Sequence, residues 1–422
     1  MSRAEPVLEA RRVAVVAYHS SPLQEPGQGD AGGMTVFVRE VAKQLAAAGV
    51  ATDIFTRATG PFDRARTVGA GVRVISVEAG PRVPLEKSEI GAYLDDFIAG
   101  VRAYALGARA VYDLVHSHYW QSGLAGVRLA RSWGVPLVHS HHTLGLVKND
   151  LLAPGDEPEP QSRIDGEHKV ISEADVLIAS TDSEWEQLSC LYRARHDTLK
   201  TIHPGVDHDV FFPGDRDAAR RELGLGDGAV MLYVGRIQPL KGLGLAVLAL
   251  EEILAATGRD VSLLVVGGPS GRRGEEEIER LEALVEQRGL GAHVRFAGPQ
   301  PHTRLPLFYR AADLLAVCSH SESFGLSALE AQACGTPVIA TAAGGLSFVV
   351  EDGHSGILLP SRDPKAFAAA ATPILFDEDA RARYAQGAVA RAQRFSWSMT
   401  ARTFKDLYDC LLRERTPEFC TC

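Results

Sequence analysis

The chain has 422 residues, of which 45% are hydrophobic and 23% charged, which is typical of a soluble globular protein with about two or three domains. Its formal net charge of −9 leaves no overall basic field that would favour nucleic acid or an anionic membrane. No apolar run is long enough to cross a membrane, the first apolar run predicts a strand and not a signal peptide, and the six scattered cysteines form no zinc-binding spacing. We therefore expect a cytoplasmic protein without nucleic-acid or membrane partners.

Short apolar runs alternate with helical patterns along the first half of the chain, which predicts an α/β domain with a buried parallel sheet. A loop rich in Gly and Pro separates the first strand from a helix that stops at Gly49. Residues 145–160 are expected to form an irregular loop that covers a cleft. The strands are expected at 12–18, 51–57, 72–79, 113–120, 135–143 and 175–181.

Gly32 and Gly33 stand just before the first helix, after a strand and a long loop. Strand, Gly-rich loop and helix together form an arrangement that binds phosphates, because backbone N–H groups point at the ligand. A tight turn is the alternative explanation of the two glycines. Since the spacing is not GxGxxG, we do not predict a nicotinamide dinucleotide.

Histidines follow three of the predicted strands of this first half. They are His19, His116 and His118, and His141 and His142. Carboxyl ends of parallel strands meet at one edge of a sheet, so the pattern indicates a shared cleft. A metal site is the alternative, but no pair of histidines at helical spacing accompanies them.

A stretch rich in Pro and Gly at 201–215 predicts a domain boundary, after which strands and helices alternate again. We expect domains at 1–206 and 207–395 and a last helical segment at 396–422. Arg236 and Lys241 flank a loop at the start of a helix, where two cations and backbone N–H groups would bind a diphosphate. Two solvated surface charges are the alternative.

The stretch 318–345 contains a polar loop, a mostly apolar helix at 325–334 and a buried strand at 338–341. Glu322 lies in the loop and Glu330 lies on the helix, where a carboxylate is costly unless it is hydrogen-bonded. Carboxylates beside a helix N-terminus suit a ligand with both hydroxyls and phosphates, such as a nucleotide sugar. The alternative is that Glu322 caps the helix and Glu330 pairs with an arginine.

This E-x7-E pattern, with Ser-Phe-Gly after the first Glu and then Cys-Gly-Thr-Pro-Val and Gly-Gly, resembles the GT4-type retaining glycosyltransferases of the GT-B fold. That resemblance implies two doubly wound Rossmann-like domains facing a central cleft. The stretches 19–34, 116–120, 142–149 and 235–242 are more closely similar to the D-inositol 3-phosphate glycosyltransferases of mycothiol biosynthesis. Members of that group move N-acetylglucosamine from UDP-GlcNAc to 1D-myo-inositol 3-phosphate with retention of configuration.

The resemblance implies roles for residues at both ends of the cleft. The residues expected to take part in catalysis, by stabilising the leaving UDP or by contacting the transferred sugar, are Gly33, His142, Arg236, Lys241 and Glu322. The donor ligands are Glu25, Pro26, Gly33, Arg236, Lys241, Gln300, Glu322, Phe324, Gly325, Leu326 and Glu330. The acceptor ligands are His19, Asp30, Gly32, Met34, Thr35, Lys87, Tyr119, Thr143 and Arg163.

No cofactor is required by this chemistry, although the family also shows a Mg²⁺ ion that we treat as incidental. Its ligands would be Tyr309, Arg310, Ala312 and Thr336. A homodimer would fit the family as well.

Three positions depart from the family pattern. Thr35 stands in place of the usual Asn, Gln300 in place of an Arg near the base, and His141 in place of a small residue. Other donors or acceptors therefore stay open, as in sucrose-phosphate synthases or in natural-product glycosylation. A UDP-sugar 2-epimerase, a phosphorylase and a non-catalytic nucleotide-sugar sensor are the more distant alternatives.

Overall fold

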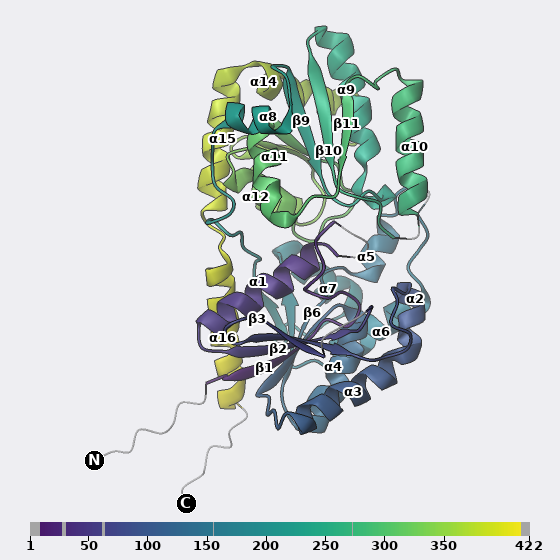
Figure 1. Cartoon of the computed structure of the whole chain (residues 1–422), viewed down its shortest axis with the longest axis vertical. Helices are drawn as coiled ribbons and strands as arrows, with labels where there is room; N and C mark the ends of the chain where they lie inside the picture. The colour runs from purple at the N-terminus through teal and green to yellow at the C-terminus, as the bar shows by residue number, and fades with distance from the viewer. Residues whose placement is uncertain (1–8, 28–30, 61–63, 155, 272, 415–422) are drawn as a thin grey trace, which may run out of the picture.

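The computed structural model describes residues 9–27, 31–60, 64–154, 156–271 and 273–414. Two α/β halves are stacked end to end, with the N-terminal half below and the C-terminal half above in Figure 1. The described residues form one sheet of eight strands and one of six, and each sheet has helices on both faces. The GT-B fold class expected from the sequence is confirmed.

The first sheet has the strand order β3-β4-β2-β1-β5-β6-β7-β8. Its strands are β1 (Arg12–Val16), β2 (Ala51–Arg57), β3 (Ala65–Gly69), β4 (Val72–Val77), β5 (Leu114–His118), β6 (Leu137–Ser140), β7 (Val176–Ala179) and β8 (Leu199–Thr201). All neighbours pair in parallel except β3 and β4, which are antiparallel. Its helices are α1 (Gly33–Ala47), α2 (Lys87–Ile90), α3 (Leu94–Gly107), α4 (Trp120–Trp133), α5 (Gly145–Asp150), α6 (Gln161–Glu173) and α7 (Asp182–Tyr192).

The second sheet has the order β11-β10-β9-β12-β13-β14 and is parallel throughout. Its strands are β9 (Ala229–Val234), β10 (Val261–Val266), β11 (Val294–Gly298), β12 (Leu314–Val317), β13 (Val338–Thr341) and β14 (Gly356–Leu359). Its helices are α8 (Arg216–Leu223), α9 (Leu243–Thr257), α10 (Gly274–Gln287), α11 (Leu305–Ala311), α12 (Leu326–Ala333), α13 (Leu346–Val349), α14 (Pro364–Phe376) and α15 (Glu378–Ala392).

Alternating side chains of β1 show how the first sheet is buried on both faces. Val15 packs into the cluster that contains Phe37 of α1, whereas Val16 packs on the opposite face in the cluster that contains Phe97 of α3. This follows from the period of two in a strand, and it explains why β1 is apolar without interruption after Arg12.

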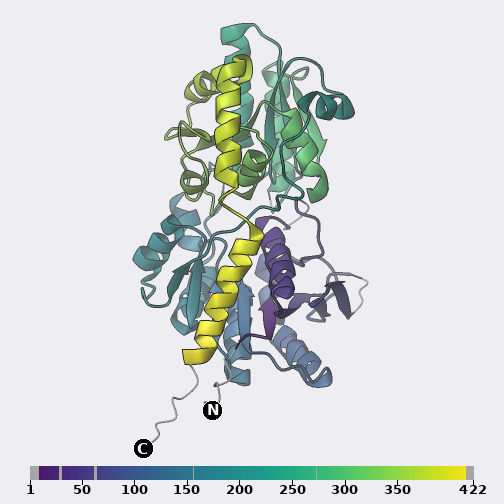
Figure 2. The ribbon, with the colours of Figure 1, turned by 90° about the vertical axis from the view of Figure 1, so that its left-hand side faces the viewer.

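Helix α16 (Trp397–Glu414) runs down the N-terminal half beside α1, as the yellow helix in Figure 2 shows. Its apolar face carries Phe404 and Tyr408, both fully buried. The Tyr408 hydroxyl lies 2.7 Å from Nδ1 of His116 on β5, and Asp409 accepts a 2.7 Å hydrogen bond from the Ala10 backbone. Helix α16 is thus part of the core of the first half.

The fold differs from the sequence prediction in helix α5 and in the two edge strands β3 and β8, neither of which was predicted. Residues 145–150 form helix α5 instead of irregular loop, because the buried Glu167 carboxylate accepts the Gly145 N–H at 3.0 Å and anchors the first turn. That partner lies on α6 and is not visible in local sequence. Strand β3 was not predicted, because every one of its residues is exposed and it pairs only at the sheet edge.

Both sheets reverse their strand order at the strand that leads into a long loop. In the first sheet β1 lies between β2 and β5, and in the second β9 lies between β10 and β12. In open α/β sheets, ligands bind outside the carboxyl ends of the strands at such a switch point. The loops after β1, β5, β9 and β12 are therefore the places to look for a site.

Candidate active site

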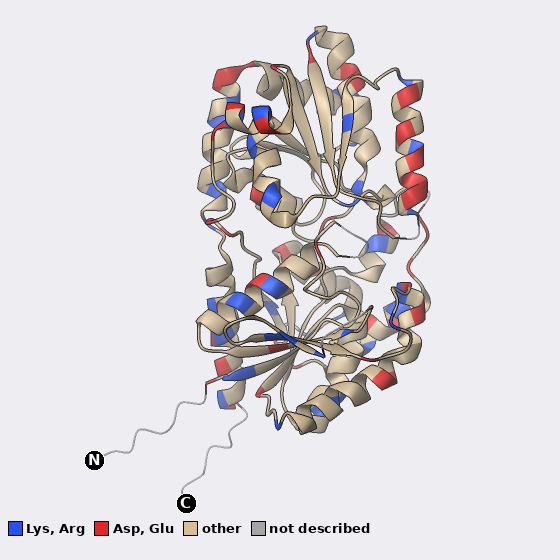
Figure 3. Cartoon of the chain, viewed as in Figure 1, with Lys and Arg blue, Asp and Glu red and all other residues tan. Residues whose placement is uncertain are grey.

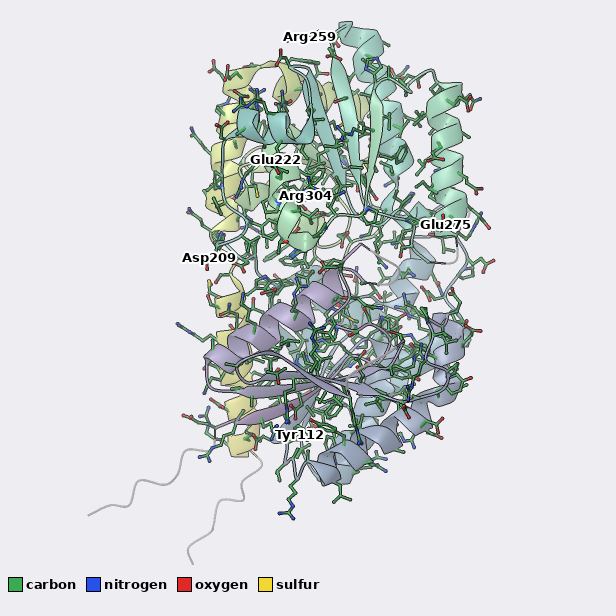
Figure 4. The ribbon with its side chains drawn as sticks, viewed as in Figure 1. Tyr112, Asp209, Glu222, Arg259, Glu275 and Arg304 are labelled. Carbon is green, nitrogen blue, oxygen red and sulfur yellow. The ribbon has the colours of Figure 1, made fainter. Side chains whose placement is uncertain are left out.

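A single cleft of about 1500 Å³ lies between the two halves and receives the loops from both switch points. Asp209 and Glu275, labelled in Figure 4, lie on opposite sides of the molecule at the level where the halves meet. The volume exceeds the range of about 300–1000 Å³ that is usual for one drug-sized ligand. The cleft therefore has room for a nucleotide sugar and a second substrate.

The glycine loop of the N-terminal half closes directly onto the C-terminal half. A Cβ atom on Gly32 would lie 3.4 Å from Nε of Arg236, and one on Gly33 would lie 3.4 Å from Cδ1 of Leu326. Gly32 is the N-cap of α1 and supplies no side-chain cap for the first-turn N–H groups. The helix start, a cation and the predicted donor residues therefore meet in one place, which suits an anion.

Lys241 and Glu322 form an ion pair, with Nζ and Oε2 2.5 Å apart. Each side chain keeps 19% of its surface exposed, so the pair borders the cleft without being sealed from it. The Ser319 hydroxyl donates to the same carboxylate oxygen at 3.5 Å. Helix α12 begins at Leu326 without a side-chain cap, so the alternative in which Glu322 caps this helix is wrong.

Gly242 allows the Lys241 loop to reach this position. Its φ of +65° is in the left-handed region, and a Cβ there would lie 2.2 Å from the Cys318 carbonyl oxygen. Any side chain would therefore clash with the end of β12. The close passage of these two loops brings Lys241 to Glu322.

Glu330 is buried and is held by two partners of its own half. The Tyr309 hydroxyl donates to Oε2 at 3.0 Å, and Nε2 of His302 lies 2.6 Å from Oε1. Burial, helped by Glu330, raises the pKa of Tyr309, so this hydroxyl keeps its proton. The alternative in which Glu330 pairs with an arginine is wrong, because the partner is His302.

His302 also contacts the N-terminal half, since a guanidinium nitrogen of Arg39 on α1 lies 3.3 Å from its Nδ1. Arginine only donates, so Nδ1 accepts and the ring proton is on Nε2, from which it is donated to Glu330. Burial alone would lower the pKa of His302, but Glu330 outweighs it and raises that pKa, while Arg39 opposes the rise. Sequence reasoning missed His302 and Arg39, because neither belongs to a motif.

The other end of the cleft is built around Tyr119, which follows β5. Its φ of +75° is unusual for a residue with a side chain and turns the ring into the cleft. The Arg163 guanidinium lies 5.1 Å and the Lys87 ammonium 5.8 Å from the ring centroid, and the His19 ring lies 4.4 Å away, centroid to centroid. The structure thus brings four of the predicted acceptor residues together.

Arg163 is 2% exposed and uses its guanidinium in several directions. One NH2 group donates to the Thr143 hydroxyl at 3.0 Å and to its carbonyl at 3.1 Å. Nε donates to Glu167 at 2.8 Å, and NH1 lies 2.9 Å from Glu159. Thr143 and Arg163 are therefore coupled, and two carboxylates balance the arginine.

His142 lies between the two ends and connects the halves. Its carbonyl accepts a hydrogen bond from the Ser323 hydroxyl, and its φ is +62°. Nε2 of His142 lies 2.9 Å from Nδ1 of His118. Burial lowers the pKa of His142 to about 3, so its ring is neutral at physiological pH. The ring can contact a sugar but carries no charge.

Some predicted residues lie away from this cleft. Glu25 is exposed and does not line it, while Thr35 is buried, with its hydroxyl 3.0 Å from that of Ser20. Asp30 lies outside the described residues. The predicted residues that do line the cleft are His19, Pro26, Gly32, Gly33, Met34, Lys87, Tyr119, His142, Thr143, Arg163, Arg236, Lys241, Gln300, Glu322, Phe324, Gly325, Leu326 and Glu330.

The four predicted magnesium ligands lie elsewhere. Arg310, Ala312 and Thr336 border a second pocket, and the Thr336 hydroxyl donates to the Tyr309 carbonyl at 2.7 Å. Within the described ranges no three His, Cys, Asp or Glu side chains are grouped to hold a metal ion. The magnesium assignment used main-chain and hydroxyl oxygens and stays a prediction.

Family models and solved structures agree on the class of protein. Residues 215–391 match the model "Glycosyl transferases group 1", and residues 32–205 match the model "Glycosyl transferase 4-like domain". A sucrose-phosphate synthase from Thermosynechococcus elongatus superposes with a TM-score of 0.88 at 33% identity, covering 96% of this chain and 100% of that chain. Anabaena HepE, solved with UDP-glucose, has a TM-score of 0.73 at 21% identity, with coverages of 94% and 99%, and supports the fold alone. The chain therefore belongs to the GT4-type glycosyltransferases of the GT-B fold and is an enzyme of that class.

Within this class, the curated relatives include enzymes named D-inositol 3-phosphate glycosyltransferase. The one from Acidothermus cellulolyticus is 48% identical over 411 residues, covering 96% of this chain and 91% of the relative. The one from Mycobacteroides abscessus is 48% identical over 409 residues, covering 96% and 90%. Among the described residues, no helix is both long and apolar enough to span a membrane.

Proposed function

We propose that this enzyme transfers N-acetylglucosamine from UDP-GlcNAc to 1D-myo-inositol 3-phosphate with retention of configuration, in the cytoplasm. The observation that carries the proposal is the cluster of Lys87, Tyr119, Thr143 and Arg163 at one end of the cleft. Two cations and two hydroxyls at one end of the cleft suit a phosphomonoester on a polyol. The names of relatives at 48% identity point to the same acceptor.

In this proposal the opposite end of the cleft binds the donor. Arg236 and Lys241, with the N–H groups at the starts of α1 and α12, stabilise the charge that develops on the leaving UDP. Lys241 turns to the diphosphate, while the Glu322 carboxylate accepts hydrogen bonds from hydroxyls of the transferred sugar. The Glu330 carboxylate, which is held by Tyr309 and His302, accepts hydrogen bonds from the hydroxyls of the ribose. Residues 1–206 then contain the acceptor domain and 207–395 the donor domain, and helix α16 in the last segment, 396–422, returns to the acceptor domain.

The reaction needs no nucleophilic side chain in this scheme. The acceptor hydroxyl attacks the anomeric carbon from the face that the diphosphate leaves, and its proton passes to the departing phosphate. Closure of the cleft around both substrates excludes water and limits hydrolysis of the donor. The neutral His142 ring contacts the sugar without competing for that proton.

Transfer to a phosphorylated sugar is the second candidate. It is favoured by the sucrose-phosphate synthase structure, which matches 96% of this chain at 33% identity. The experiment is to incubate the enzyme with UDP-GlcNAc or UDP-glucose and with inositol 3-phosphate or fructose 6-phosphate, and to measure UDP release and product mass. Release that depends on inositol 3-phosphate, with the mass of its GlcNAc adduct, supports the proposal. UDP release that depends on fructose 6-phosphate and not on inositol 3-phosphate supports the second candidate instead.

A further inference from the structure

The acceptor end of the cleft contains a cation and a carboxylate to which the proposed reaction assigns no role. Lys148 on α5 forms an ion pair with Glu159, and the same Glu159 oxygen lies 2.9 Å from NH1 of Arg163. Lys148, Glu159 and Arg163 all line the cleft. A carboxylate thus lies between two cations at the place where the acceptor's phosphate is expected.

For Arg163 to grip a phosphate, one of its present partners must yield. Glu167 is fully buried and also accepts hydrogen bonds from the Gly145 N–H and the Tyr192 hydroxyl, so it is fixed in the core. The Thr143 carbonyl belongs to the main chain after β6, and the Thr143 hydroxyl is itself assigned to the acceptor and carries no charge that would compete with a phosphate. Glu159 keeps 19% of its side-chain surface exposed and belongs to no helix or strand. Glu159 is therefore the partner that can be exchanged.

The main chain of Glu159 is held while its side chain faces the cleft. The Glu159 N–H donates to Oδ1 of Asn149 at 2.7 Å, and the amide of Asn149 donates to the Glu159 carbonyl at 3.5 Å. Lys148 and Asn149 are consecutive, so one residue binds the carboxylate and the next binds the backbone. A change of side-chain rotamer is enough to release the two cations, without movement of the segment.

Charge favours the exchange. Glu159 pairs with both Lys148 and Arg163, Glu167 pairs with Arg163, and the Asp156 carboxylate also interacts with Lys148. A phosphate monoester carries up to two negative charges near neutral pH. Exchanging the Glu159 carboxylate for such a phosphate places up to two negative charges beside Lys148 and Arg163 where there was one, which favours the bound acceptor.

We propose that Glu159 is an internal competitor of the acceptor's phosphate for Lys148 and Arg163, and that Lys148 is a further cation of the acceptor site. This inference rests on the proposed function to the extent that the acceptor carries a phosphate. It makes Glu159 a determinant of specificity, because an unphosphorylated polyol lacks the charge to displace this carboxylate.

The test compares Glu159→Gln, Lys148→Gln and the matched control Glu157→Gln, a change of a neighbouring carboxylate that also lines the cleft. Binding of inorganic phosphate is measured by calorimetry on the full chain, and the KM for inositol 3-phosphate is measured in parallel. Glu159→Gln should tighten phosphate binding and lower that KM by about three- to tenfold. Lys148→Gln should weaken phosphate binding and raise that KM by a similar factor. Glu157→Gln should change neither the phosphate affinity nor the KM.

Equal phosphate affinity in wild type and Glu159→Gln overturns the inference. So does a rise in the acceptor KM of Glu159→Gln, which would make Glu159 an acceptor ligand and not a competitor. The phosphate measurement does not depend on turnover. Tighter phosphate binding together with no transfer to inositol 3-phosphate would uphold the competitor and reject only the proposed acceptor.

Discussion

His302 links Glu330 of the C-terminal half to Arg39 of the N-terminal half through its two ring nitrogens. Nε2 lies 2.6 Å from the Glu330 carboxylate, and Nδ1 lies 3.3 Å from the Arg39 guanidinium. The Glu330 carboxylate, which we assign to the ribose, is therefore positioned by His302, and His302 also contacts the N-terminal half. We therefore expect orientation of the donor and closure of the cleft to be coupled through this ring.

Replacing His302 with Phe should weaken donor binding more than it slows turnover. The ring volume is kept, but Glu330 loses a hydrogen bond and its fixed rotamer, so the KM for UDP-GlcNAc and the Kd of UDP should rise by about tenfold. Calorimetry with UDP and steady-state kinetics measure both. An unchanged Kd would show that Tyr309 alone orients Glu330.

Replacing Arg39 with Met should have a smaller effect on UDP binding, about two- to threefold, because it acts only through His302. The control is Lys43→Met, one turn further along α1, where Lys43 lies 3.6 Å from Asp207 and not near His302. An equal loss of UDP affinity in both variants would mean that positive charge between the halves matters in general, and that the contact of Arg39 with His302 has no specific effect.

Replacing Lys241 with Ala should lower kcat by about a hundredfold or more, because it removes a cation from the developing charge of the leaving group. The melting temperature should change little, since both members of the Lys241–Glu322 pair remain partly exposed. The control is Lys169→Ala, at an exposed position of α6. Wild-type turnover in Lys241→Ala would remove Lys241 from the site.

Gly242 and Gly258 form a matched pair, with φ angles of +65° and +60°. A Cβ on Gly242 meets the Cys318 carbonyl at 2.2 Å, whereas one on Gly258 meets nothing within 4 Å. Gly258→Ala should cost about 1 kcal/mol of unfolding free energy, and Gly242→Ala about 1–3 kcal/mol more. Turnover should fall in Gly242→Ala alone, because Lys241 is displaced. Equal losses of stability would contradict the close passage of the two loops.

Burial of His141 should make the protein sensitive to acid. Burial lowers its pKa to about 3, whereas the unfolded chain binds a proton there at an ordinary pKa of about 6.5. Below that value the unfolded state binds more protons, so the unfolding free energy falls as pH falls, by about 1.4 kcal/mol per pH unit for this histidine.

The check is urea denaturation of wild type and His141→Ala between pH 7 and pH 4.5. The variant should show a shallower dependence of unfolding free energy on pH, whatever its stability at pH 7. Both ring nitrogens of His141 are buried and no hydrogen-bond partner is seen for either among the described residues, so the variant removes no visible bond. The same slope in both proteins would mean that His141 takes up a proton in the folded state.

The fold could be predicted because it follows from local patterns, whereas most residues of the candidate site were predicted from the family resemblance. Apolar strands with loops at their carboxyl ends define the switch points; Lys241 and Glu322 are charges in those loops, and Glu330 is a charge on a mostly apolar helix. What each charge contacts could not be predicted, since those contacts join distant segments. Glu322 pairs with Lys241, Glu330 with His302, and Arg163 with Glu159 and Glu167. Helix α5 was missed for the same reason, because its anchor lies on α6.

The ratio of kcat/KM for two phosphorylated acceptors tests the central claim most directly. With UDP-GlcNAc as donor, kcat/KM is measured for 1D-myo-inositol 3-phosphate and for fructose 6-phosphate. We predict a ratio of at least about a thousandfold in favour of the inositol phosphate, because the cleft must orient the ring hydroxyls as well as the phosphate. A ratio near one, or one that favours fructose 6-phosphate, would contradict the proposed acceptor.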